Sequence, residues 1–583
     1  MSATKKIVRR PPSPSGSQFS KPLHPLLQRV YAARGVTSDQ SLNYSLSELA
    51  PLSALKGLDE AVQLLTTALA QQQHIMIVAD FDADGATSCV VAMRALRLMG
   101  AQQVSYLVPN RFEYGYGLTP EIVALAKQQQ PDLIVTVDNG ISSIEGVAEA
   151  IASGIKVLVT DHHLPGAALP NADAIVNPNQ PGDVFPSKNL AGVGVIFYVM
   201  LALRTHLRAT DWFEQQGIAE PNLGQLLDIV ALGTVADVVP LDHNNRVLVS
   251  QGLVRIRRGA CCAGINALLA VGKRNPATIV AADLGFAVGP RLNAAGRLED
   301  MSLGIECLLA DDPDAAMLLA QRLDELNRER REIEGEMQAQ ALDCLANIKL
   351  DFEDATAPIG LCLFDESWHQ GVVGIVASRI KDRYHRPVIA FALANSSNEG
   401  SELEGAEIKG SARSIKGVHM RDVLDAVAAK NPGLLTKFGG HAMAAGMTLK
   451  SGDLTAFEVA FNEELRRCVD SELLQDVIHS DGELSHHELT LELAETLRGA
   501  GPWGQTFPEP VFDGVFNIVQ QRIVGEKHLK LVLQPEGSSI TIDAIAFNHS
   551  ETVGDQLHAA YRLDVNDYQG RRTVQLMIEH IVL

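Results

Sequence analysis

The sequence predicts an α/β protein of several domains, the first of which contains a parallel sheet covered by helices. Four apolar runs, IMIVA (75–79), VSYLV (104–108), LIVTV (133–137) and VLVT (157–160), are separated by alanine- and leucine-rich segments. Continuous β-branched runs that alternate with helices are typical of buried parallel strands. A chain of 583 residues is also too long for a single hydrophobic core.

Composition gives the broad class of the protein. Hydrophobic residues make up 46% and charged residues 20% of the chain, as in an ordinary globular protein. The seven cysteines form no CxxC pair, which favours reduced thiols in the cytoplasm. No apolar run is long enough to predict a membrane span. The net charge of −21 argues against indiscriminate binding of polyanions but leaves room for a local basic groove.

Four further segments follow from pattern and composition. The start of the chain is rich in Pro and Ser, contains Lys5, Lys6, Arg9 and Arg10, and lacks the apolar core of a secretory signal. Apolar residues at three- and four-residue intervals predict one long helix near 312–348. A smaller α/β unit and a β-rich tail come next. We therefore expect a disordered basic arm at 1–44, a catalytic domain at 45–310, a linker helix at 311–350, a second α/β domain at 351–460, and a β-barrel with a preceding helical segment at 461–583.

A cluster of carboxylates follows the first apolar run. VADFDADGAT (78–87) places Asp80, Asp82 and Asp84 at alternate positions, where their charges repel one another unless a cation neutralises them. DFDADG also matches the start of an EF-hand calcium loop. Such a loop needs a bidentate Glu at its twelfth position, which is Val91 here, and it follows a helix rather than a strand. We therefore exclude an EF-hand.

Acidic residues and histidines follow other apolar runs as well. Asp138 lies in VDNG, the triplet Asp161–His162–His163 follows VLVT, and Asp237 follows a fourth apolar stretch. A single Asp in such a place is often an ordinary turn residue. Since the carboxyl ends of parallel strands share one edge of a sheet, however, this repetition favours a convergent site. Carboxylates with one or two imidazoles suit Mn²⁺ or Mg²⁺ better than zinc.

The two adjacent histidines are expected to have different roles. Neighbouring side chains in extended backbone point in opposite directions, so we do not expect His162 and His163 to bind the same ion. One can bind metal, while the other faces the substrate as a hydrogen-bond donor or general acid.

Taken in order, DFDADG, VDNG, DHH and Asp237 resemble the motifs of the DHH phosphoesterase superfamily. GGHAMAAG (439–446) resembles the GGH motif of its accessory DHHA1 domain, and the β-rich tail resembles an OB fold. The order and spacing are most similar to the branch of 5′-to-3′ exonucleases specific for single-stranded DNA. The resemblance covers residues 45–583 and implies a phosphodiesterase with two Mn²⁺ or Mg²⁺ ions, acting in DNA repair and recombination.

The resemblance also implies roles for individual residues. The metal ligands would be Asp80, Asp82, Asp84, Asp138, His162 and Asp237. Asp82, Asp138, His162 and His163 would be catalytic, with Asp138 the bridge between the ions and Asp161 beside them. Arg presents a fork that matches phosphate oxygens, although an arginine in a turn is as often a plain surface residue. Small-residue contexts suited to phosphate and the resemblance together predict a substrate-binding set of Arg111, Arg291, Arg297, Ser411, Arg413 and His441. Within this set, the resemblance implies that Arg111, Ser411 and Arg413 hold the terminal 5′-phosphate and that His441 contacts phosphate close to the metals.

Other functions and partners stay open at the level of sequence. The same metal centre serves enzymes that cleave short oligoribonucleotides or cyclic dinucleotides, but such compact substrates do not require the additional β domain. A non-catalytic scaffold would have lost metal ligands, and none is missing here. Besides single-stranded DNA, the resemblance suggests a single-strand-binding protein and a RecQ-type helicase as partners of a monomer, with no membrane.

Overall fold

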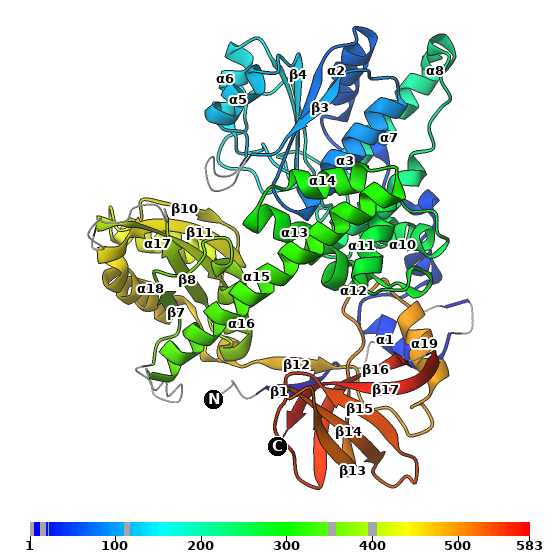
Figure 1. Ribbon diagram of the computed structural model, residues 1–583, viewed down its shortest axis with the longest axis vertical. Coiled ribbons are helices and arrows are strands. Elements are labelled where there is room, and N and C mark those ends of the chain that lie inside the picture. Colours follow the sequence, from blue (N-terminus) through cyan, green and yellow to red (C-terminus); the bar gives the residue numbers. More distant parts are fainter. Residues whose placement is uncertain are drawn as a thin grey trace.

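The structure, a computed structural model, describes residues 5–11, 19–20, 23–109, 117–347, 357–394, 405–568 and 570–582. Three globular parts are visible in Figure 1: a large first domain at the top, a smaller second domain at the left, and a barrel at the bottom. A single long helix, α15, runs from the first domain to the second. This arrangement agrees with the predicted order of catalytic domain, linker helix, second α/β domain and barrel.

The first domain is built on a five-stranded parallel sheet of order β3-β2-β4-β5-β6. In β2, Ile75, Ile77 and Ala79 face one hydrophobic core, while Met76 and Val78 face another. Both faces are thus covered by helices, which explains why the strand lacks polar positions. The strands are β2 (Ile75–Ala79), β3 (Val104–Leu107), β4 (Leu133–Val137), β5 (Lys156–Thr160) and β6 (Ala174–Val176). The covering helices are α2 (Leu58–Ala70), α3 (Ala83–Leu98), α5 (Pro120–Lys127), α6 (Ile144–Ala152) and α7 (Gly192–Ala209).

The rest of the first domain is helical. The apolar stretch before Asp237 is helix α9 (Leu227–Ala236) and not another strand, a correction to the sequence-based expectation. Buried on all sides, this helix has no polar face, so its pattern resembles that of a buried strand. Helix α7 has the length and composition of a membrane span, but two-thirds of it is buried inside the fold, as in a core helix. The remaining helices are α8 (Trp212–Gln216), α10 (His243–Arg257), α11 (Ala263–Val271), α12 (Ala281–Asp283), a π-helix (Leu284–Val288), α13 (Gly289–Leu298) and α14 (Ser302–Leu309).

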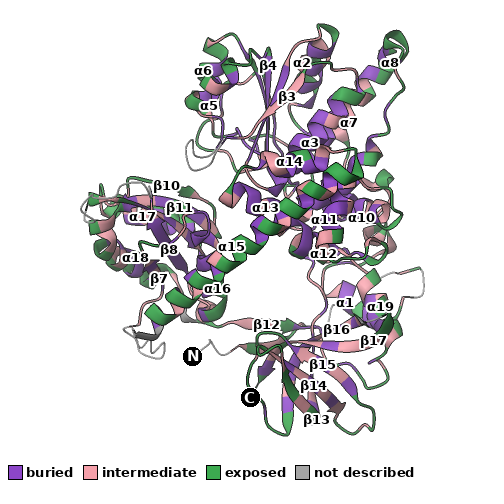
Figure 2. Cartoon of the chain, viewed as in Figure 1, coloured by how far each residue is buried: buried purple, intermediate pink, exposed green. Residues whose placement is uncertain are grey.

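Helix α15 (Pro313–Asn347) belongs to two cores. Leu323 and Leu326 are buried in the core of the first domain, whereas Met337 and Ala341 are buried in that of the second. Figure 2 shows one side of the helix exposed along its length. The sequence predicts this helix well, but its role is more than that of a solvated spacer, because it is packed at both ends.

The second domain has a sheet of order β10-β11-β9-β8-β7. Phe457, Phe461 and Leu465 of its last helix are fully buried in its core. The expected boundary at residue 460 therefore falls inside a helix that belongs to this domain. The elements are β7 (Leu361–Phe364), α16 (Val373–Tyr384), β8 (Val388–Leu393), β9 (Glu407–Arg413), α17 (Met420–Lys430), β10 (Lys437–Gly440), β11 (Ala444–Lys450) and α18 (Leu454–Cys468).

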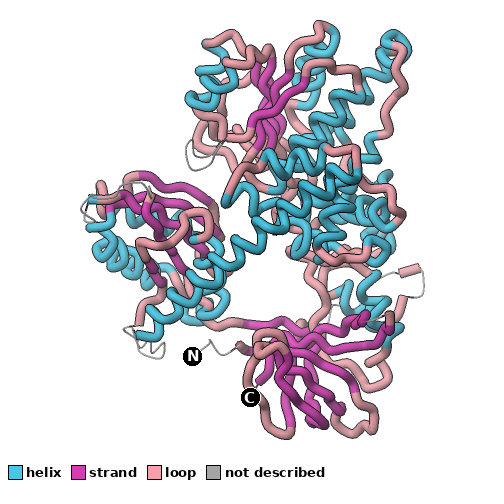
Figure 3. The backbone as a smooth tube through the Cα atoms, viewed as in Figure 1, coloured by secondary structure: helices cyan, strands magenta, loops and turns pink. Residues whose placement is uncertain are grey.

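The C-terminal part is a closed five-stranded barrel of order β13-β14-β15-β17-β16, which forms the strand-rich lower part of Figure 3. Tyr561 of β16 is only 1% exposed and packs inside the barrel, so it cannot stack on a DNA strand. Arg572 forms an ion pair with Glu495, and the side chain of Tyr568 lies outside the described residues. The elements are α19 (Leu491–Gly499), β13 (Phe512–Val524), β14 (His528–Pro535), β15 (Ile542–Ala546), β16 (Gln556–Tyr568) and β17 (Arg571–Val582).

The start of the chain is folded in the parts that the structure describes, which corrects the expected disordered arm at 1–44. Strand β1 (Lys6–Arg9) pairs in parallel with β12 (Val477–Ser480), the segment that joins the second domain to the barrel. Helix α1 (Pro25–Ala32) buries four apolar side chains. Basic residues that composition alone assigns to a solvated arm form ion pairs instead: Arg9 binds the buried carboxylate of Asp513 at 2.7 Å.

Replacing Arg9 by alanine should lower the free energy of unfolding by about 1–3 kcal/mol, because the buried carboxylate of Asp513 loses its strongest donor. Burial raises the pKa of Asp513, but hydrogen bonds from Arg9, Ser480 and His558 outweigh burial and lower it below 3.8. The free energy of unfolding should therefore differ most between the variant and the unmodified protein at pH 7, and this difference should shrink as the pH falls below 3.8. Calorimetric unfolding measures it. Lys5→Ala is the matched control, since its carboxylate partner Asp476 is less buried than Asp513 and the loss should cost little.

Candidate metal centre

The first three aspartates surround the start of helix α3. Asp82 is its N-cap: the carboxylate accepts hydrogen bonds from the backbone N–H of Asp84 at 2.9 Å and of Gly85 at 3.1 Å. A side chain at Gly85 would lie 2.4 Å from the carbonyl oxygen of Asp80. The small residue thus lets the helix start directly against the end of strand β2, and the three carboxylates are held in one tight turn.

Asp84 is buried against the N-terminus of helix α7. Its two carboxylate oxygens accept hydrogen bonds from the backbone N–H groups of Gly192 at 2.7 Å and Val193 at 2.9 Å. A helix N-terminus offers unpaired donors and a partial positive charge, so it stabilises a carboxylate. Helix α7 therefore offsets part of the repulsion between Asp84 and its neighbours.

Asp138 follows strand β4 with a left-handed backbone, φ 62°. The Asn139 side chain next to it donates to the carbonyl oxygens of Val78 and Val137, which ties together the ends of β2 and β4. A methyl group on Gly192 would lie 2.7 Å from both Cβ and Oδ1 of Asp138. The position of Asp138 thus depends on a glycine more than fifty residues away in the chain.

Asp161 orients the histidine pair. Its Oδ1 accepts hydrogen bonds from the His162 backbone N–H at 2.7 Å and from Nδ1 of His163 at 2.8 Å, and its Oδ2 accepts from the Ile141 N–H at 2.9 Å. Burial alone raises the pKa of Asp161, but the hydrogen bond and charge of His163 outweigh it, so the pKa is lowered. Asp161 is an ionised anchor for His163 rather than a free ligand.

His162 points into the group of aspartates. Its Nε2 lies 3.1 Å from Asp138, 3.5 Å from Asp237 and 4.0 Å from Asp84, measured to carboxylate oxygens. Burial, followed by the charge of His163, lowers the pKa of His162 to about 3. The imidazole is therefore neutral near pH 7 and retains a lone pair, as a metal ligand requires.

These side chains form three overlapping sets, in each of which the ligand atoms lie within 4.8 Å of one another. Within the described part of the chain, Nε2 of His162 and Oδ2 of Asp237 are buried and have no hydrogen-bond partner. Buried polar atoms normally have partners, so this absence marks a place for a cation. The sets are Asp80, Asp82 and Asp138; Asp84, His162 and Asp237; and Asp138, His162 and His163.

The pKa values of the carboxyl groups show how strongly the site needs a cation. Burial, followed by the charge of Asp82, raises the pKa of Asp84 to about 7. Burial and the neighbouring aspartates also raise the pKa values of Asp138 and Asp237 well above their ordinary range. Divalent cations reverse this effect, because each supplies two positive charges at the point of greatest repulsion. The donor set therefore fits two hard cations that prefer oxygen ligands.

The second domain contributes to this centre. The turn between β10 and β11 brings His441 next to His163, with ring centroids 5.7 Å apart and nearly parallel planes. Burial, followed by the charge of His163, lowers the pKa of His441. The GGH segment thus lies beside the metal centre, as expected from its resemblance to the DHHA1 motif.

Ser411 and Arg413 lie together on strand β9. The guanidinium of Arg413 donates to the Ser411 hydroxyl at 3.0 Å. A methyl group on Gly374, in the first turn of helix α16, would lie 2.7 Å from Nη2 of Arg413 and 2.8 Å from Oγ of Ser411. A hydroxyl, a guanidinium and a helix N-terminus in contact are the donor types that bind phosphate.

Comparisons with known proteins agree with this architecture. The family model described as DHH family, N-terminal domain, matches residues 74–234, the DHHA1 domain matches 357–467, and the RecJ OB domain matches 480–580. The single-stranded-DNA-specific exonuclease RecJ of Dickeya dadantii is 53% identical, over 100% of both chains. The chain belongs to the RecJ family.

Other members of the RecJ family support the same conclusion. The RecJ of Escherichia coli is 52% identical over 96% of each chain. A crystal structure of RecJ from Thermus thermophilus in complex with Mn²⁺ has a TM-score of 0.78 and 28% identity, and covers 96% of this chain and 76% of that one. A second crystal structure, of the same RecJ with Mg²⁺, has a TM-score of 0.72 and 26% identity.

The structure describes the other three arginines of the predicted substrate-binding set to different extents. Arg111 lies outside the described residues. Arg291 is buried and forms an ion pair with Asp324 of α15 at 2.7 Å, so its visible contacts are structural. Arg297 donates to the carbonyl oxygen of Gly371, where α13 meets the second domain. Contacts of these three arginines with DNA stay predictions.

Sequence reasoning missed the residues that support the metal ligands. Oδ1 of Asn293, in GPRLNAAGR, accepts a hydrogen bond from the Ala83 N–H at 2.8 Å, and a methyl group on Gly296 would lie 2.0 Å from the Phe81 carbonyl oxygen. Helix α13 therefore braces the DFDADG turn. The small residues of GPRLNAAGR are a visible signal for such close packing, but Gly192 of AGVGV has no signal that separates it from an ordinary helix start.

Replacing Gly192 by alanine should weaken Mn²⁺ binding by at least about tenfold, because the methyl group displaces Asp138. Isothermal titration calorimetry measures the affinity, and circular dichroism verifies the fold. Gly194→Ala, two residues along the same helix, is the matched control: its methyl group meets the Leu190 side chain and not Asp138. Equal metal affinity in the two variants would show that Gly192 does not position Asp138.

Proposed function

We propose that this protein is a Mn²⁺- or Mg²⁺-dependent exonuclease that hydrolyses single-stranded DNA in the 5′-to-3′ direction, in DNA repair and recombination. The observation that carries the proposal is the group of five aspartates and two adjacent histidines, gathered from four chain segments in one site. Full-length identity of 53% to a RecJ exonuclease and of 52% to another supports the substrate class.

Asp80, Asp82, Asp84, Asp138, His162 and Asp237 would hold the two cations, with Asp138 shared between them. Asp138 and His162 each occur in two of the three ligand sets, and of these two only the carboxylate has two oxygens to offer to two ions. When bound, the ions stabilise negative charge on the phosphoryl oxygens and lower the pKa of water. The carboxylates fix the position of these charges, and the surrounding fold limits access of bulk water to them.

His163 is suited to act on the substrate. Because Asp161 accepts a hydrogen bond from its Nδ1, the ring would present Nε2 to a phosphate oxygen. His441 lies against the same ring, from the second domain. We infer that the two imidazoles hold the scissile phosphate from the side opposite the aspartates.

The polarity of degradation would come from Ser411 and Arg413. Both side chains contact the first turn of helix α16, in the domain that also contributes His441. A terminal 5′-phosphate carries more charge than an internal phosphodiester, so a guanidinium, a hydroxyl and a helix N-terminus together favour it. Arg111 would complete this group.

For its setting, we propose a monomer that works in the cytoplasm with a single-strand-binding protein and a RecQ-type helicase. All seven cysteines are free thiols, as expected in a reducing compartment. A helicase would supply the free single strand that the enzyme requires.

The direct test is a timed digestion of a strand labelled at one end, compared with its duplex, with and without Mn²⁺. The single strand should be shortened from its 5′ end only when metal is present, and the blunt duplex should persist.

Asp82→Ala should reduce cleavage at least about a thousandfold, because it removes both a ligand and the N-cap of α3. Asp59→Ala, an exposed aspartate on α2, should cleave normally. Faster cleavage of a dinucleotide than of a 40-mer would favour a small-substrate phosphoesterase instead.

Arg413→Ala should reduce kcat/KM for a 5′-phosphorylated strand by about tenfold or more, because one charge-assisted contact to phosphate is lost. The same strand with a 5′-hydroxyl is the matched control, and its cleavage should change little. Initial rates on both strands measure the ratio. If the variant loses activity equally on both substrates, Arg413 does not recognise the terminal phosphate.

A further inference from the structure

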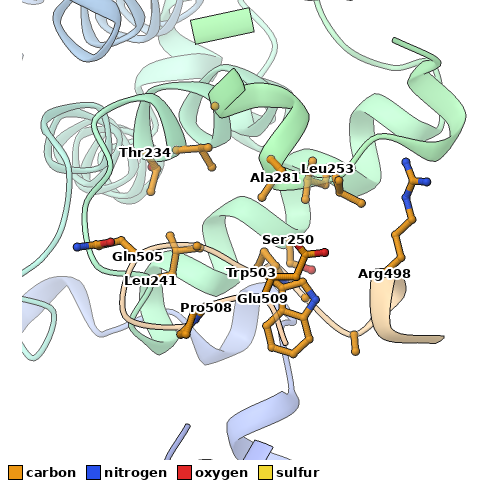
Figure 4. A pocket seen from close by; sticks show the side chains of 18 of the residues that line it. Thr234, Leu241, Ser250, Leu253, Ala281, Arg498, Trp503, Gln505, Pro508 and Glu509 are labelled. Carbon is orange, nitrogen blue, oxygen red and sulfur yellow. The ribbon is translucent and has the colours of Figure 1, made fainter. Parts of the chain in front are cut away.

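A cavity of about 640 Å³ lies between the first domain and the segment that leads into the barrel. Its walls come from helices α9, α10 and α12, from Tyr31 and Tyr44 near the N-terminus, and from residues 498–509. In Figure 4, Leu253 and Ala281 line one wall, Trp503 and Pro508 line the other, and Arg498 lies at one end. The motifs of the metal centre do not include this cavity.

The cavity borders the segment that carries a metal ligand. Thr234, Val235, Val238 and Val239 all line it, and Asp237 lies between them in the chain. Val238 has a left-handed backbone, φ 61°, which is strained for a β-branched residue, and its side chain is 64% exposed. Asp237 faces the aspartates while its neighbours face the cavity. The segment around Asp237 therefore forms a wall that the metal centre and the cavity share.

The charge of the cavity is positive. Arg257 and Arg498 line it and donate to the carbonyl oxygens of Ile279 and Thr278. In the described parts of the chain, neither arginine has a carboxylate within ion-pair distance, although the whole protein has a net charge of −21. Glu509, the carboxylate among the lining residues, forms an ion pair with Arg562 at 2.7 Å. The cavity thus combines apolar walls with two guanidinium groups whose positive charges could attract an anion.

Phe286 stands at the cavity, in the π-helix that follows α12. Its side chain is 78% exposed, an unusual cost for a phenylalanine in a protein that buries most of its large apolar side chains. Exposed aromatic rings beside cationic groups are the usual surface on which proteins stack the bases of single-stranded nucleic acid. A π-helix is also frequent at functional sites.

We propose that this cavity binds one nucleotide of the single strand on the 3′ side of the cleaved bond. Phe286 stacks on its base, and Arg257 and Arg498 hold the phosphate next to it. The inference rests on the proposed exonuclease function and extends it with a second contact for the strand. The site holds the strand between successive cuts, so it acts on long substrates and not on the shortest ones.

The test compares Phe286→Ala with Phe286→Trp in the full chain, using a 5′-phosphorylated 20-mer and a trinucleotide. The alanine variant should raise KM for the 20-mer about tenfold, leave kcat within twofold, and cleave the trinucleotide normally. The tryptophan variant should restore the KM. Leu318→Ala is the control, because Leu318 is 69% exposed on α15, outside the cavity.

A second measurement locates the base. Strands with 2-aminopurine at successive positions should show one quenched position when bound to the unmodified protein, and Phe286→Ala should lose that quenching. Arg257→Gln with Arg498→Gln should weaken binding of the same strand and reduce its salt dependence. Unchanged KM and quenching in Phe286→Ala, with normal digestion of the 20-mer, overturn the inference and leave the cavity to a different occupant, such as an acidic peptide. Absence of digestion by the unmodified protein would overturn the proposed function instead.

Discussion

Mutual repulsion among buried carboxylates is the constraint around which the first domain is built. Burial and neighbouring charges raise the pKa values of Asp84, Asp138 and Asp237. Nearby backbone groups offset part of this repulsion. The N–H groups at the N-terminus of α7 donate to Asp84, and those at the start of α3 donate to Asp82. Such clustering of charge costs stability in the protein without cations, and the same residues are the ones that we propose as metal ligands.

The second consequence concerns geometry between domains. His163 and His441 come from different domains and yet stack, so the two domains must keep a fixed relation. Helix α15 provides it, because its buried residues belong to both cores. Within it, the buried carboxylate of Glu334 accepts hydrogen bonds from Arg330 at 2.6 Å and from Arg379 of α16 at 2.8 Å, and the second of these links the helix to the second domain. A rigid connection keeps the groups that we propose to bind phosphate at a constant distance from the aspartates.

Much of this structure follows from the sequence, and what does not follow has identifiable causes. Strands buried on both faces leave a clear signal, which is why the parallel sheet and the convergence of Asp80, Asp138 and His162 are predictable. The pattern of helix α9 cannot be told from that of a buried strand, because its burial removes the polar face by which an amphipathic helix is recognised. Arg291 and Arg9 lie in contexts suited to phosphate or solvent, yet each pairs with an acidic residue that only the fold brings near. Long-range pairing of charges, and the closeness of Gly192 to Asp138, cannot be read from local pattern.

The pairing of β1 with β12 has a consequence for how the protein is made. Lys6 emerges from the ribosome hundreds of residues before Val477, its partner in the ladder, so the first strand must wait unpaired for most of synthesis. Closing so long a loop is entropically costly and slow, although the cost grows only with the logarithm of the loop length. The three domains can fold one after another, but the barrel takes its final place only when both ends of the chain are complete. A product truncated before β12 therefore keeps an unpaired edge at β1, and such an edge is a binding site for chaperones and proteases that recognise exposed strands.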